Sequence, residues 1–140
     1  MKRVISFIII LVIFTVPAFA EDKFMDDYNF YAENVFHISP IGPVEDAVIT
    51  VYASDNVELF PMNKSIIIRS ATHFDAICSA CCVLRSLDNA GNRVDQFGRI
   101  MHIYFLAKSA PGEIKIATTE SGIQIAAQID KNMLYIFVEE

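Results

Sequence analysis

The sequence predicts a mainly β protein, a small antiparallel β-sandwich that follows a cleaved signal peptide and a short N-terminal helix or arm. Two observations predict the sandwich. Apolar and polar residues alternate in several short segments, of which residues 123–129 are the clearest. Turn sequences such as Pro111-Gly112 separate these segments at intervals of about eight to twelve residues, as in sandwiches and barrels.

The N-terminus has the three parts of a secretory signal peptide. A basic start, MKR, is followed by an apolar run from Val4 to Val16, and the segment PAFA then ends at Ala20. Its two alanines have the A-x-A spacing of a cleavage site. The apolar run is shorter than the ~20 residues that a spanning helix needs. We therefore expect cleavage after Ala20 and a periplasmic or secreted product.

The expected organisation is a signal peptide at 1–20, an acidic aromatic arm at 21–43 and a β-sandwich domain at 44–140. The whole chain has 11 basic and 17 acidic residues, a formal net charge of −6. Cleavage would remove two basic residues and make the charge more negative. Such a chain repels phosphate backbones, so nucleic acid is not an expected partner. No second apolar stretch is long enough to predict a stable membrane span.

The arm carries aromatic residues at helical spacing. Phe24, Tyr28, Tyr31 and Val35 are separated by four, three and four positions, which places them on one stripe of a helix. We expect this stripe to pack on the domain, with a contact face for a partner as the alternative. Aromatic residues are enriched at interfaces. The candidate contact residues are Asp26, Asp27, Tyr28, Phe30 and Tyr31.

Strands are predicted after the SPIGP segment that ends the arm. Alternating or β-branched residues indicate strands at 44–52, 64–69, 113–118, 123–129 and 133–138, with a hairpin connection at 130–132. The segment IMHIYFLA, residues 100–107, is apolar on both faces and predicts a central, covered strand.

All three cysteines lie in ICSACCVLRS, residues 77–86, which can be read in two ways. As a strand, it would lead through the turn sequence DNAGN to a returning strand at 94–97. As a helix, it would begin at the N-cap Thr72 and would keep the cysteines together on one side. We expect the strand, with the helix as the alternative.

Two stretches support the strand interpretation by likeness. The turn DNAGN, residues 88–92, is similar to turns that recur in bacterial immunoglobulin-like domains. The segment FLAKSAPGEIKI, residues 105–116, resembles the strand–Pro-Gly–strand step of those domains. The resemblance implies that the predicted sandwich is immunoglobulin-like.

The cysteines have several possible roles. His73, Cys78, Cys81 and Cys82 are four potential metal ligands close together in the sequence. An exported chain meets an oxidising compartment, but an odd number of thiols cannot all pair within one chain. On a strand, Cys81 would point away from the other two. We expect buried core residues, with a disulfide or a metal or redox site as alternatives, and no cofactor.

No catalytic motif is present: the sequence lacks G-x-S-x-G, H-E-x-x-H and a phosphate-binding glycine loop. We therefore expect an exported, non-catalytic binding protein rather than an enzyme. Inhibitors, immunity-type proteins and accessory subunits of envelope complexes belong to this class. The expected partner is another protein in the envelope or outside the cell, and the oligomeric state stays open. The alternative is a small metal-binding or thiol-redox protein centred on the cysteines.

Overall fold

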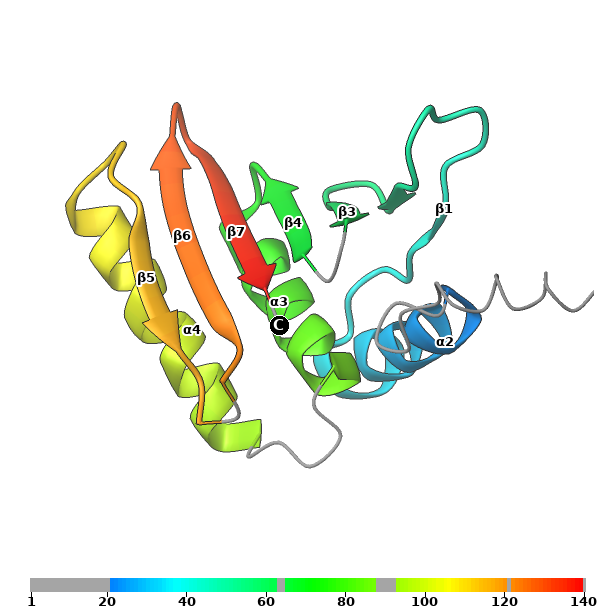
Figure 1. Cartoon of the computed structure of the whole chain (residues 1–140), viewed down its shortest axis with the longest axis horizontal. Helices are drawn as coiled ribbons and strands as arrows, with labels where there is room; N and C mark the ends of the chain where they lie inside the picture. Colours follow the sequence, from blue (N-terminus) through cyan, green and yellow to red (C-terminus); the bar gives the residue numbers. More distant parts are fainter. Residues whose placement is uncertain (1–20, 63–64, 88–92, 121, 140) are drawn as a thin grey trace, which may run out of the picture.

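A seven-stranded antiparallel sheet forms the centre of the computed structural model, which describes residues 21–62, 65–87, 93–120 and 122–139. The strand order is β1-β2-β3-β4-β7-β6-β5. Helices α3 and α4 lie together on one side of the sheet (Figure 1). The predicted signal peptide and the DNAGN turn lie outside the described residues.

The elements have the following bounds. The helices are α2 (Glu21–Tyr31), the π-helix η2 (Ala32–Phe36), α3 (His73–Leu87) and α4 (Arg93–Ser109). The strands are β1 (Gly42–Pro43), β2 (Tyr52–Ala53), β3 (Glu58–Met62), β4 (Ser65–Ser70), β5 (Lys115–Thr118), β6 (Gln124–Asp130) and β7 (Met133–Glu139).

The last three strands confirm the prediction for the C-terminal third. Strands β5, β6 and β7 lie within or next to the expected segments, and β6 and β7 form the expected hairpin. Lys131 and Asn132 connect them with φ of 53° and 69°. Two consecutive positive φ angles are typical of a type I′ turn, whose twist matches that of the flanking strands. Strand β4 confirms the strand expected near 64–69.

The core lies between the sheet and the helices. Alternate residues of the central strands are almost fully buried, including Ile66 and Ile68 of β4 and Ile136 of β7. Helix α3 contacts β4 and β7, and α4 contacts β5 and β6. The period of two along each strand therefore sends one set of side chains into the helical layer.

The cysteine segment is a helix, so the expected strand is wrong. Every residue of α3 from Ala76 to Leu84 is buried, which fits a helix that is apolar on all sides. The helix lies between the sheet and α2. Thr72 O accepts a 3.2 Å hydrogen bond from Ala76 N, in agreement with a helix start at this residue. When all sides of a helix are buried, its sequence shows no apolar stripe, and such a sequence cannot be distinguished from that of a covered strand.

Residues 94–97 and 100–107 also belong to a helix, α4, and the predicted strands there are wrong. Ile100, Ile103, Tyr104 and Ala107 are buried and have the helical spacing of three and four. Exposed apolar residues such as Phe105 obscured this pattern in the sequence. The fold is therefore mixed α and β rather than mainly β. In the described part of the chain, helices cover the face on which a sandwich would pack its second sheet.

The segment 44–52 is less regular than predicted. Only Tyr52 of this segment lies in a strand, and residues 44–51 are irregular and mostly exposed. Val44 N still donates a 2.9 Å hydrogen bond to Val51 O, which closes the loop between β1 and β2. The alternation of β-branched residues there is thus not matched by a buried face.

The N-terminal arm is part of the same core, as its aromatic stripe predicts. Phe24, Tyr28 and Ala32 are buried, and α2 packs on α3. The rings of Phe24 and Tyr52 lie 6.0 Å apart, which links α2 to the sheet. Val35, the last residue of the predicted stripe, is exposed.

None of the helices in the described ranges combines the length and the apolar character needed to cross a bilayer.

Candidate functional site

The three thiols are buried inside the helical layer. Cys78, Cys81 and Cys82 are free cysteines with almost no exposed surface. Burial raises the pKa of Cys78 to about 11 and that of Cys81 to about 12, and it also raises the pKa of Cys82. A thiol reacts and binds metals as the thiolate, so burial of these groups disfavours both at neutral pH.

His73 links three elements. Its Nε2 lies 2.9 Å from Asn132 O in the β6–β7 turn, and its Nδ1 lies 2.9 Å from the Tyr104 hydroxyl of α4. Because a carbonyl oxygen can only accept, Nε2 donates to Asn132 O, and in the neutral imidazole Nδ1 then accepts from the Tyr104 hydroxyl. Both ring nitrogens are therefore engaged. Within the described residues, no three His, Cys, Asp or Glu side chains are grouped so that they could hold a metal ion.

Tyr28 is not available to a partner, which corrects its place among the candidate contact residues. Its side chain is 0% exposed, and its hydroxyl shares a 2.6 Å hydrogen bond with Ser79 Oγ of α3. Burial raises the pKa of this hydroxyl well above its ordinary value. Tyr28 thus attaches α2 to the cysteine helix.

The remaining arm residues are divided between surface and packing. Phe30 is 58% exposed and packs edge-on against the Tyr31 ring, with centroids 5.5 Å apart. The Arg85 guanidinium lies 5.0 Å from the centroid of the Tyr31 ring. Asp27 forms an ion pair with Lys23 over 2.7 Å, and Asp26 is exposed. Phe30 and Asp26 are therefore the arm candidates that are most accessible to a partner.

An apolar surface lies on the face of the sheet opposite α3 and α4. We call it the open face. Five residues are aligned across five strands by the strand register: Phe60 of β3, Ile67 of β4, Phe137 of β7, Ala126 of β6 and Ile116 of β5. Directly opposite residues on neighbouring strands point to the same face. These five residues form the apolar row. No helix of the described chain lies over this face (Figure 1).

Polar residues flank the apolar row. On one side, the register aligns Glu58, Arg69, Tyr135 and Gln128. On the other, it aligns Ser65, Glu139, Gln124 and Thr118. Arg69 forms an ion pair with Glu58, and its guanidinium lies 5.8 Å from the centroid of the Phe60 ring. The open face thus has an apolar centre and a polar rim, which is the usual arrangement of a protein-binding surface.

A groove of about 480 Å³ lies at one end of the open face. Residues from the β2–β3 turn, β3, β4 and β7 line it, including Asp55, Glu58, Arg69 and Met133. The Glu58–Arg69 ion pair and the Asn56–Asp75 hydrogen bond of 3.1 Å engage much of its polar chemistry. The groove thus adds a polar hollow to the rim of the open face.

The open face was missed in the sequence analysis, although β7 carried a sign of it. Residues 133–138, MLYIFV, are apolar on both faces. Leu134 and Ile136 account for the buried face, which leaves Tyr135 and Phe137 for the other. Their alignment with Ile116 depends on the order and register of the strands, which one strand alone does not reveal.

No family model, curated protein or solved structure matches the chain.

Proposed function

We propose that the chain is an exported, non-catalytic binding protein that uses the open face to bind another protein in the envelope or outside the cell. The apolar row carries this proposal. Contiguous apolar surface with a polar rim marks an interaction site more often than scattered apolar residues do. Ile116, at one end of the row, is 66% exposed.

The chemistry of the reactive side chains supports a binding role. The three thiols are buried and protonated at neutral pH, since burial raises the pKa of each. His73 uses both ring nitrogens to connect α3 with α4 and the β6–β7 turn. A nucleophile needs a neighbouring base that can reach it. The thiols are packed in the core and both ring nitrogens of His73 are engaged, which supports a structural role for these side chains.

The charge of the chain indicates the chemistry of the partner. The chain has a formal net charge of −6. On the open face, Glu139 is exposed beside the apolar row, and Arg69 is already paired with Glu58. A second copy would bring like charges together, whereas a partner with basic groups around an apolar patch would complement this face. The proposed partner is therefore a different, basic protein.

Substitution of Phe137 tests the open face. We expect Phe137→Glu to weaken partner binding at least about tenfold, or ~1.4 kcal/mol, because a charge would be desolvated in the centre of the interface. The partner is first captured from the envelope or culture fraction of the source cell. It is then purified, and its Kd is measured by titration calorimetry with each variant.

Two variants with the same chemical change serve as controls. Phe105→Glu alters a residue of α4 that is 56% exposed, and Phe30→Glu alters the arm. Both should bind as the wild type does. Unchanged affinity of Phe137→Glu would exclude the open face, and a selective loss with Phe30→Glu would assign binding to the arm instead.

Export is proposed from the N-terminal sequence, and its expected result is a shortened product. When the full chain is expressed in a bacterium with a C-terminal tag, the purified protein should begin at Glu21. Intact-mass spectrometry of the periplasmic and cytoplasmic fractions measures this directly. A product that keeps the complete N-terminus and stays in the cytoplasmic fraction would contradict export.

A further inference from the structure

We propose that the partner binds by adding an extended segment to the outer edge of β5, so that the sheet continues into the partner. This inference rests on the proposed function and names its binding mode. Pairing of an extended segment with a sheet edge is a common mode of recognition, in which backbone hydrogen bonds give affinity and alternate side chains give specificity.

The two edges of the sheet differ. Strand β1, at one edge, has only the two residues Gly42 and Pro43. Proline has no backbone N–H, and short strands with proline protect a sheet edge from pairing. Strand β5, at the other edge, contains neither glycine nor proline between Lys115 and Thr118. The β5 edge therefore lacks the protection that the β1 edge has.

The register of β5 shows which of its backbone groups point outward. Thr119 N donates a 2.8 Å hydrogen bond to Ile123 O, and Ala117 lies opposite Ile125 in the same register. Hydrogen-bonded and non-hydrogen-bonded pairs alternate along an antiparallel ladder. The N–H and C=O groups of Ile116 and Thr118 consequently point away from β6, where an added strand could bond to them.

The side chains of β5 extend the apolar row to this edge. Ile116 ends the row, and Ile114 is also 56% exposed. An added strand would place one of its residues directly opposite Ile116, on the open face. An apolar residue at that position would continue the row, which predicts alternating apolar residues in the bound segment.

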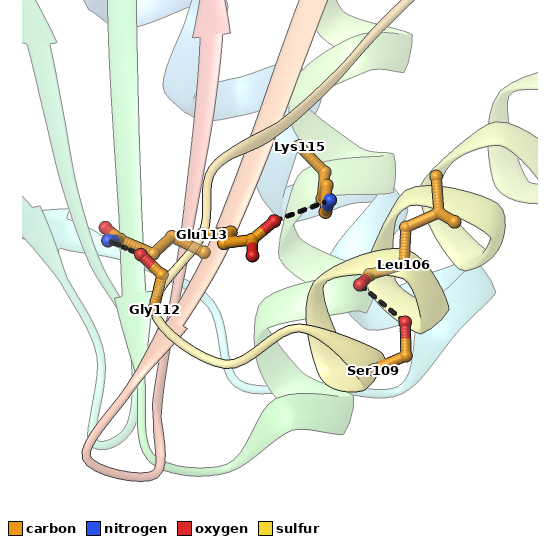
Figure 2. Close-up of polar contacts among 6 residues, drawn as sticks. Leu106, Ser109, Gly112, Glu113 and Lys115 are labelled. Carbon is orange, nitrogen blue, oxygen red and sulfur yellow. Dashed lines mark hydrogen bonds and ion pairs between the residues drawn. The ribbon is translucent and has the colours of Figure 1, made fainter.

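Local contacts hold the beginning of β5 in place. Gln128 Nε2 donates a 2.9 Å hydrogen bond to Gly112 O, and Lys115 pairs with Glu113 over 2.9 Å (Figure 2). In the preceding turn of α4, Ser109 Oγ donates to Leu106 O over 2.9 Å. An edge that is already extended and anchored loses less conformational entropy when a segment binds.

Charge decides between a partner and a second copy. Glu113 and Glu120 are both exposed and lie before and after β5, and Glu113 also pairs with Lys115 of the same chain. Pairing of two β5 edges would bring these carboxylates from both copies to one short ladder, within chains of net charge −6. A segment with Lys or Arg at its ends would complement them. The occupant is therefore an extended, basic-flanked, apolar segment of a partner protein.

Hydrogen exchange of the outward amides tests this mode without altering the protein. The probe is the capped peptide Lys-Val-Thr-Val-Thr-Val-Lys. It is added to the full chain, or to residues 21–140 if the export experiment shows that the first twenty residues are removed. We expect the amides of Ile116 and Thr118 to exchange at least about tenfold more slowly with the peptide bound, since each gains an acceptor. The peptide with glutamate at both ends should bind more weakly. Absence of binding, or binding without protection of these amides, would overturn the inference.

A pair of substitutions at Thr118 gives an independent test. Thr118→Pro removes an outward N–H and should weaken peptide binding at least about tenfold relative to Thr118→Ala, which keeps the N–H and changes the side chain alone. Circular dichroism verifies that each variant is folded, and amide protection in the wild type decides the question if Thr118→Pro is not. If Phe137→Glu no longer binds the partner protein while Thr118→Pro binds it normally, the open face is the binding surface and pairing with the β5 edge is wrong. If both bind normally, the proposed surface and the edge mode both fail.

Discussion

Raising the pH from 9 to 11 is expected to destabilise the folded protein strongly. The three thiols have an ordinary pKa of 9.0, and burial raises the pKa of Cys78 to about 11 and that of Cys81 to about 12, and it also raises the pKa of Cys82. Above pH 9 the unfolded chain therefore loses protons that the folded chain keeps. The free energy of unfolding then falls as the pH rises, whereas these groups have no effect well below pH 9.

The expected size of this effect is large. Each buried thiol lowers the free energy of unfolding by about 1.4 kcal/mol per pH unit between its unfolded and folded pKa. Three thiols together would remove several kcal/mol by pH 11, a large part of the ~5–15 kcal/mol that stabilises a typical domain. Burial also raises the pKa of Tyr28, which acts in the same direction above pH 10. Urea unfolding followed by circular dichroism at several pH values measures the slope.

A cysteine variant provides the control. Cys82→Ala should be less stable at neutral pH but should lose about one third of the slope above pH 9, because one of three thiols is gone. The native protein at pH 8 should also leave its thiols unmodified by a water-soluble disulfide reagent until it is denatured. Rapid modification of native thiols, or detection of a bound metal, would instead favour the metal or thiol-redox alternative.

Truncation of Ile136 is the second expected large effect. Ile136 of β7 is 1% exposed and faces the helical layer. We expect Ile136→Ala to lower the free energy of unfolding by about 2–5 kcal/mol, from lost apolar burial and the cavity left behind. Urea denaturation at pH 7 measures the change in midpoint.

Its neighbour Phe137 is a matched control for the two faces of one strand. Phe137 lies on the open face and is half-buried. Phe137→Ala should cost only about 1 kcal/mol although the residue removed is larger, since the ring is not enclosed by the helical layer. An equal or greater loss with Phe137→Ala would mean that the open face is covered in the folded protein, and it would remove the main support for the proposed binding surface.

The contrast between these neighbours shows why the sequence predicted some elements and missed others. Strand β6, with buried Ile125 and Ala127 and polar Gln124 and Gln128 between them, could be identified because one of its faces meets water. Helix α3 could not, because its burial on all sides removes the contrast between polar and apolar faces. Residues 100–107 were misread because the exposed side of α4 also carries apolar residues.

The sequence by itself determined the C-terminal strands, the tight β6–β7 turn and the helical spacing of the N-terminal aromatic stripe. Each depends on neighbours in the chain, such as alternation along a strand or the chemistry of a turn. The tertiary structure alone decided that the cysteine segment is a central helix, that Tyr28 is buried against Ser79, and that Phe60, Ile67, Phe137, Ala126 and Ile116 share one row. These features join residues far apart in the chain, so strand order and register, which are set by packing of the whole core, determine them.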